Sequence, residues 1–410
     1  CPRLSMSGAR PATATSAAPA PARRGAPTVW LVVLAIAAIG YPFAMKALDA
    51  EFYVSVASRI MVWAIAATSL NLILGYGGLV SFGHAAFLGI GAYTVGILIT
   101  DGVTSGWVGI PAAMLLAALV AVPIGAISLR TRGVYFIMIT LAFGQMAFYF
   151  AQALSAYGGD DGLTLYEKST LFGREIFGNR TGFYYIALGT LAFCYWLAHR
   201  IVASRFGRVL RAARENAVRV TVTGYDVNHV RLGAYVISGM MAGLAGFLLA
   251  NQTDFVSPAY MSWSRSGELI FMAVLGGVGS LYGAILGALA FLITEDVLSS
   301  LTQNWKVIFG PLIVLFVLFV NQLLGRPFID SLLFSVALGL GMSPELLPAI
   351  ISVTLALAVI LVGTLGWSVT AARQYLDGQL ESEGDNAASA LALSLSQPAN
   401  QDAVTRELLM

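Results

Sequence analysis

The sequence is short of charged residues and of cysteine. Only 11% of its 410 residues are charged, against about 25% in an ordinary soluble domain, so the chain lacks the residues for a water-soluble surface. Its two cysteines, Cys1 and Cys194, allow neither a disulfide framework nor a thiolate metal site. The net charge of +2 is too small to indicate a nucleic-acid partner. These absences predict a protein solvated by membrane lipid.

Motifs for catalysis are also missing. A P-loop requires a lysine directly after a glycine, and none of Lys46, Lys168 and Lys306 has a glycine before it. No metal-ligand cluster, serine nucleophile motif or carboxylate pair falls at membrane depth. We therefore expect no enzymatic activity and no metal or cofactor bound by this chain. Any ATP that drives it must be hydrolysed by partner subunits.

Apolar runs long enough to cross a bilayer, about 20 residues each, fill most of the chain. They predict an all-α fold, a polytopic transmembrane bundle of about nine or ten spans, with a tenth run at about 346–371. Glycines at positions 276, 277, 279 and 283 interrupt the run 267–294 and predict a broken or re-entrant helix there. The nine clearer runs are 29–45, 52–74, 78–100, 107–128, 133–154, 183–203, 231–252, 267–294 and 307–324.

The ends of the chain differ from this apolar middle. Residues 1–28 are rich in alanine, proline and arginine, a composition typical of a disordered tail. Residues 29–324 hold the nine runs and form the expected transmembrane domain. Residues 325–410 form a C-terminal extension, with room for an extra span and a polar tail.

Arginines indicate the topology. The segment 204–230 holds five of them before Arg231, with Glu215 as the only acid before Asp226. Loops rich in arginine and lysine stay in the cytoplasm. Counting spans from a cytoplasmic amino terminus places segment 204–230 inside and loop 155–182 outside, which agrees with the arginine distribution.

A short internal match also occurs. Residues 77–81 and 276–280 share the form Gly-Gly-x-x-Ser, and transporters are often built from internal repeats. The match leaves an inverted repeat open, although one this short also arises by coincidence. His84, in the run that follows the first segment, either makes a polar contact between helices or lines a substrate path. The candidate path residues are Ser81, His84, Gln145, Gly276 and Gly277.

Five strings resemble a known family. They closely resemble the membrane permeases of branched-chain amino acid ABC importers, of the LivM kind within the LivH/LivM family. The likeness runs over about 52–320. The strings are Gly75–Thr94 (GYGGLVSFGHAAFLGIGAYT), Gly133–Gln145 (GVYFIMITLAFGQ), Tyr157–Leu163 (YGGDDGL), Phe206–Asn216 (FGRVLRAAREN) and Ser264–Gly287 (SRSGELIFMAVLGGVGSLYGAILG).

The resemblance implies a bacterial inner-membrane importer in which two permeases, two ATPases and a periplasmic substrate-binding protein cooperate. ATP binding to the ATPases would swing the permease helices between inward and outward access, moving leucine, isoleucine or valine. Import of urea or short amides by the same family is the nearest alternative. An ion-coupled carrier working alone is disfavoured by the scarcity of buried charge.

The same analogy places the partner contacts. Segment 204–230 would hold the helix that docks on an ATPase, although basicity at a membrane edge explains its arginines without a partner. Loops 155–182 and 253–266 would receive the binding protein, although exposed turns explain their charges nearly as well. The candidate ATPase contacts are Arg211, Arg214, Glu215, Asn216, Gly224 and Tyr225, and those for the binding protein are Asp160, Asp161, Asp254 and Arg265.

Overall fold

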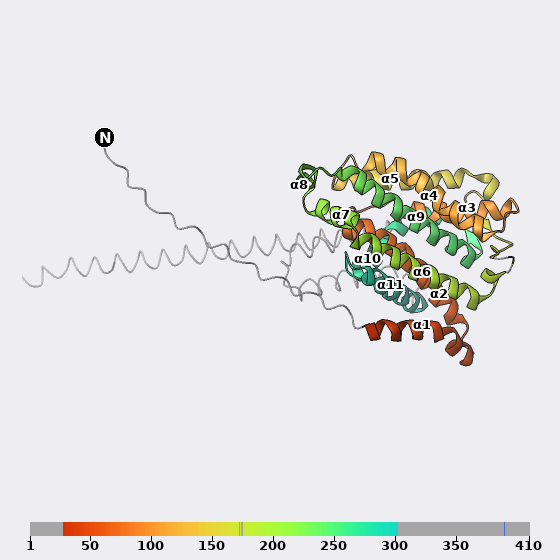
Figure 1. Cartoon of the computed structure of the whole chain (residues 1–410). Helices are drawn as coiled ribbons and strands as arrows, with labels where there is room; N and C mark the ends of the chain where they lie inside the picture. Colours follow the sequence, from red (N-terminus) through yellow and green to blue (C-terminus); the bar gives the residue numbers. More distant parts are fainter. Residues whose placement is uncertain (1–27, 172, 174, 302–388, 390–410) are drawn as a thin grey trace, which may run out of the picture. The chain divides into compact units, whose positions relative to one another are not determined.

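The computed structural model describes residues 28–171, 173, 175–301 and 389. Within this part the chain is mostly helical, which confirms the predicted fold class (Figure 1). The first helices are α1 (Thr28–Ala47), α2 (Phe52–Asn71) with the π-helical turn η1 (Leu72–Tyr76), α3 (His84–Thr100), α4 (Gly106–Ser128) and α5 (Val134–Ala153). They are followed by α6 (Arg180–Ala203), α7 (Arg205–Glu215), α8 (Ala217–Val222), α9 (Val227–Thr253), α10 (Trp263–Leu275) and α11 (Leu281–Leu301).

Six of the described helices are long and apolar enough to cross a membrane: α2 with η1, α4, α5, α6, α9 and α11. The shorter apolar helix α3 joins them. The predicted run 267–294 is divided between α10 and α11 by a break at 276–280, as its glycines indicated. The predicted runs 307–324 and 346–371, most of the extension 325–410 and the tail 1–27 lie outside the described residues.

The core of residues 28–294 is built on α2, α3 and α9. Both α2 with η1 and α9 are largely buried, whereas α4 and α5 expose apolar side chains, as helices solvated by lipid do. Helices α3 and α9 touch backbone to backbone. A Cβ atom at Gly91 would lie 2.1 Å from the Gly243 carbonyl oxygen, and one at Gly246 would lie 1.9 Å from that of Leu88. Only glycine permits this approach.

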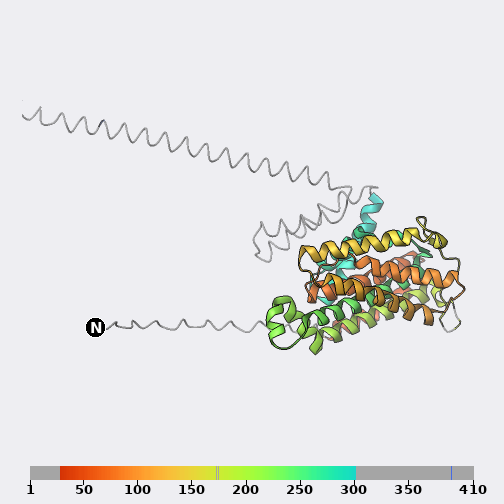
Figure 2. The same ribbon diagram turned by 90° about the horizontal axis from the view of Figure 1, so that it is seen from above.

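Two groups of loops collect at opposite ends of this bundle. At one end, β1 (Leu163–Thr164) pairs antiparallel with β2 (Phe255–Val256), which joins the two loops predicted to face outward. At the other end, α7 lies beside η1 and α8 packs against α7, and Figures 1 and 2 both show α7 and α8 grouped there. The relative placement of the loops agrees with the span count made from the arginines.

Candidate functional site

The sequence of α7 separates an apolar face from arginines. Ser204 caps the helix, since its Oγ accepts a hydrogen bond from the Gly207 amide at 3.3 Å. Gly207, Leu210 and Ala213 recur every three residues and are buried together. The four arginines of the helix are exposed. The helix therefore packs on the bundle with one face and presents charge with the other.

Helix α7 is fastened to the start of α9. The Arg231 guanidinium donates a hydrogen bond to the Ala213 carbonyl at 2.9 Å, which satisfies an acceptor in the last turn of α7. Apolar contacts supplement this bond through a small cluster that joins α7, α8 and α9: Val209, Ala213, Ala217, Val220 and Val227.

A carboxylate caps the helix that follows. The Asp226 side chain accepts hydrogen bonds from the amides of Asn228 and His229 at 2.9 and 3.2 Å, so it caps α9. A hydrogen bond with the His229 side chain, Nδ1 to Oδ2 at 2.7 Å, lowers the pKa of Asp226 below its ordinary value. The cap is therefore ionised at neutral pH.

Arg214 extends from α7 to the membrane-spanning part. Its Nη1 donates to the Gly75 carbonyl in η1, and its side chain covers Gly78, where a Cβ atom would lie 2.8 Å from the Arg214 Cγ. Arg211, by contrast, bonds the carbonyls of Gly207 and Val202 at 3.4 and 3.3 Å, on its own helix and at the end of α6. Among the predicted ATPase contacts, Arg214 is thus the one that also binds η1.

The other predicted ATPase contacts surround this helix end. Glu215, Asn216, Gly224 and Tyr225 are all exposed. Asn216 also caps α8, accepting from the Arg219 amide at 3.0 Å, and Gly224 adopts a φ of +89° that favours glycine. Their contact with an ATPase stays a prediction.

Asn71, the last residue of α2, binds the second segment of the form Gly-Gly-x-x-Ser, residues 276–280. Its amide donates to the Ser280 carbonyl at 2.9 Å, and its Oδ1 accepts from the Gly279 amide at 3.1 Å. Gly75 lies so close that a Cβ atom there would be 2.5 Å from the Gly279 nitrogen. Asn71 is fully buried, and the sequence analysis missed it, although a lone amide near the end of an apolar run was a usable signal.

The two segments share one end of the bundle. The helices before them, α2 with η1 and α10, both run toward this end, beside Arg214. An inverted repeat would place matching segments at opposite ends. The pair therefore gives the inverted repeat no support, and that repeat stays a prediction.

His84 lies in a polar contact between helices rather than at an open surface. It is fully buried, and its Nε2 lies 2.9 Å from Ser69 Oγ on α2 and 3.5 Å from Ser238 Oγ on α9. The Ser69 hydroxyl donates to the Ala66 carbonyl at 2.6 Å, so we assign the Nε2 proton to His84 as donor. This geometry favours the first of the two interpretations of His84.

The other candidate path residues are spread along the bundle. Ser81 Oγ lies 3.5 Å from the Tyr235 hydroxyl in the buried core. Gln145 is half-buried on α5, whereas Gly276 and Gly277 form the turn between α10 and α11. The structure therefore brings Gly276 and Gly277 to the Arg214 end of the bundle, apart from the mid-bundle contact of His84.

Replacing His84 by leucine should lower the thermal unfolding midpoint of the purified protein in detergent. The change removes the donor to Ser69 and Ser238, and an unsatisfied buried polar group costs about 1–3 kcal/mol. His199→Leu is the control, because His199 is exposed. Equal midpoints for wild type and His84→Leu would show that the buried contact adds no stability.

The predicted docking residues take different positions. Asp160, which accepts from Gln152, and Asp161 are exposed, and Asp254 pairs with Lys168 at 3.0 Å. These three lie on the loops joined by β1 and β2. Arg265 lies instead in the first turn of α10, where it pairs with Glu268 at 2.6 Å and its guanidinium carbon is 5.7 Å from the Trp63 ring centre.

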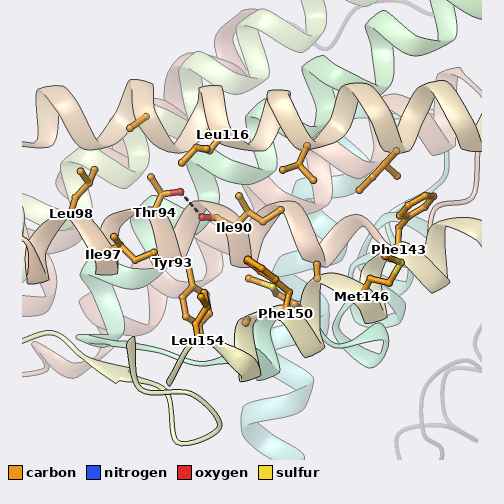
Figure 3. A pocket seen from close by; sticks show the side chains of 16 residues that line it. Ile90, Tyr93, Thr94, Ile97, Leu98, Leu116, Phe143, Met146, Phe150 and Leu154 are labelled. Carbon is orange, nitrogen blue, oxygen red and sulfur yellow. Dashed lines mark hydrogen bonds between the residues drawn. The ribbon is translucent and has the colours of Figure 1, made fainter. Parts of the chain in front are cut away.

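An apolar cavity of about 640 Å³ lies between α3, α4 and α5 (Figure 3). Side chains of Tyr93, Leu116, Phe143 and Phe150 line it. The Thr94 hydroxyl, one of its few polar groups, donates to the Ile90 carbonyl of its own helix at 2.7 Å. Such walls suit an acyl chain or an apolar side chain and offer nothing to fix a charged group.

The chain is similar to known transport proteins. Residues 52–319 match the family model described as branched-chain amino acid transport system, permease component. The high-affinity branched-chain amino acid transport system permease protein LivM of Escherichia coli (strain K12) is 29% identical over 317 residues, which cover 72% of this chain and 74% of the relative. The corresponding LivH protein of the same strain is 25% identical over 290 residues, covering 66% and 93%. No solved structure shows a significant match.

Proposed function

Because the chain belongs to the family of permease components of branched-chain amino acid transport systems, we propose that it forms one half of an ATP-driven import path for leucine, isoleucine and valine. The membership makes it a multi-pass, non-catalytic membrane subunit. We place it in a bacterial inner membrane beside a second permease, with two ATPases on the cytoplasmic side and a periplasmic binding protein on the other.

The observation that carries this proposal is the contact of Arg214 with η1. Helix α7 is amphipathic, exposes its arginines and lies at one end of the bundle, as a docking helix for a soluble subunit would. The Arg214 side chain of α7 donates a hydrogen bond to the Gly75 carbonyl in η1, and the Ala213 carbonyl of α7 accepts a hydrogen bond from Arg231 of α9. A displacement of α7 by an ATPase would therefore reach two membrane helices directly.

Glycines with positive φ lie in the segments beside Arg214. Gly78, Gly277 and Gly279 have φ values of +68°, +100° and +83°, a region that other residues rarely adopt. Each lies in a short connection between helices, next to α3 or α11. In our proposal these connections are the hinges through which a shift of α7 changes the angle between α2 and α10, and access alternates between the two sides.

The substrate assignment rests on the family and on the relatives. Urea and short amides remain the rival cargo, because a binding protein can set the selectivity of the whole importer. The rival is distinguished by its charge, since urea is neutral whereas an amino acid at neutral pH is a zwitterion.

Reconstitution into proteoliposomes tests the proposal. We expect vesicles that hold this chain, its second permease and both ATPases to accumulate labelled leucine under one condition only. ATP must be present on the side that the ATPases face, and the binding protein must be present on the opposite side. Urea uptake in the same vesicles should stay at the level of empty liposomes. Leucine accumulation by vesicles without ATPases would establish an ion-coupled carrier and overturn the proposal.

A further inference from the structure

The first turn of α10 lies near the middle of the membrane. Trp63 is 11 residues after Phe52 and 13 before Tyr76 in the span of α2 with η1, which at 1.5 Å per residue is about 16 Å and about 20 Å from its ends. The Arg265 guanidinium carbon is 5.7 Å from the Trp63 ring centre. The hydrocarbon core is about 30 Å thick, so Arg265 lies close to its midplane.

A second contact also places this turn well inside the membrane. The Ser266 hydroxyl accepts a hydrogen bond from the Ala85 amide at 3.0 Å. Ala85 lies 15 residues before Thr100, the end of α3 at the β1 and β2 side, which is about 22 Å along the helix. The predicted outer loop 253–266 therefore descends into the bundle, because η4 (Pro258–Met261) and the start of α10 pack against α3.

Arg265 and Glu268 form an ion pair at this depth. Their nitrogen and oxygen are 2.6 Å apart, and Glu268 is almost enclosed, with 8% of its side chain exposed against 35% for Arg265. A charged side chain facing lipid at the bilayer centre costs at least about 2.5–3.5 kcal/mol. The exposed part of Arg265 therefore faces a path or a protein neighbour rather than lipid.

Several hydroxyl groups lie next to the pair in the sequence. The segment 262–267 reads Ser-Trp-Ser-Arg-Ser-Gly. The hydroxyls of Ser262 and Ser264 lie 3.0 Å apart, and both residues are half-buried. Such a group of hydroxyls and charges is rare at membrane depth, where polar side chains mark the route of a polar cargo.

We propose that Arg265 and Glu268 form the mid-membrane site for the two charges of the transported amino acid. The guanidinium would bind the α-carboxylate, and Glu268 would bind the α-ammonium group, so the cargo is exchanged for the internal ion pair. Contact with the Trp63 ring keeps Arg265 in place while Glu268 turns to the cargo. This inference rests on the proposed function, because a neutral cargo such as urea carries neither charge.

The exchange explains why the Arg265 side chain is more exposed than the Glu268 side chain. A guanidinium has five donors in a planar fork, so it can hold a second carboxylate beside Glu268 or in its place. Glu268 stays enclosed until a cation arrives, since an unpaired carboxylate at this depth is costly. Each charge of the site is thus neutralised before and after the cargo enters.

Leucine uptake by variants in the reconstituted importer tests the site. Arg265→Gln and Glu268→Gln should each lower uptake about tenfold or more, the effect of losing a charge-assisted hydrogen bond, while both permeases and both ATPases still copurify. Arg200→Gln is the matched control, because Arg200 also lies over a tryptophan, 6.0 Å from the Trp196 ring centre, but in the last turn of α6, next to α7. The control should keep wild-type uptake.

The double variant Arg265→Gln with Glu268→Gln separates a structural pair from a binding site. Two amides can still bond each other, so a merely structural pair would leave uptake near wild type, which would overturn the inference. Loss of copurification of the second permease would assign Arg265 to the subunit interface and would also overturn it. Failure of wild-type vesicles to accumulate leucine would instead refute the proposed function.

Discussion

Alanine in place of Arg214 is expected to reduce ATP-driven leucine uptake about tenfold or more, with the complex still assembled and still hydrolysing ATP. The variant removes the charge-assisted bond from α7 to the Gly75 carbonyl, and such bonds contribute about 1.5–3 kcal/mol. It also exposes Gly78, which the Arg214 side chain covers. The ATPases would then move α7 without moving η1, so hydrolysis and transport separate.

Uptake and ATP hydrolysis measured in the same vesicles check this expectation. Arg214→Lys should recover part of the uptake, because lysine keeps the charge and one donor but not the planar fork. The control is Arg208→Ala on the same helix, since Arg208 donates to the nearby Ala203 carbonyl at 3.4 Å, at the end of α6. Unchanged uptake by Arg214→Ala would show that α7 transmits motion by another route.

The sequence predicted the elements of this site better than their connections. Runs of apolar residues located α2 through α6 and α9, and the glycines at 276–279 located the break between α10 and α11. The strings 75–94 and 264–287 indicated the family, which the match over residues 52–319 confirms. These features are local, because a span or a break is determined by the residues within it.

The missed features all join distant residues. Asn71 bonds Ser280, which is 209 positions away, and Arg265 lies against Trp63, which is about 200 positions earlier in the chain. Nothing in the run 253–266 itself indicates that it descends into the bundle, since its depth is determined by packing of η4 and α10 against α3. A single sequence records no such pairing, and the docking role considered for Arg265 was based on loop position alone.

The close crossing of α3 and α9 leads to the second large effect, on folding. Gly246→Ala should sharply lower the thermal midpoint and the yield of monodisperse protein in detergent. A Cβ atom there would lie 1.9 Å from the Leu88 oxygen and 2.8 Å from the Ala92 nitrogen, both backbone atoms of a buried helix. A backbone atom cannot move away by rotation as a side-chain atom can, so the two helices must separate. Overpacking of this kind costs about 1–3 kcal/mol or more.

Gly189→Ala is the matched control for that substitution. Gly189 also lies inside a membrane-spanning helix, α6, but a Cβ atom there meets nothing within 4 Å. Alanine is favoured over glycine in a helix by about 0.5–1 kcal/mol, so this variant should match or exceed the wild-type midpoint. A lower midpoint for Gly246→Ala together with an equal or higher midpoint for Gly189→Ala would show that the contact between α3 and α9 determines stability, and not the loss of a glycine as such. Equal midpoints for the two variants would mean that α3 and α9 do not cross this closely in the folded protein.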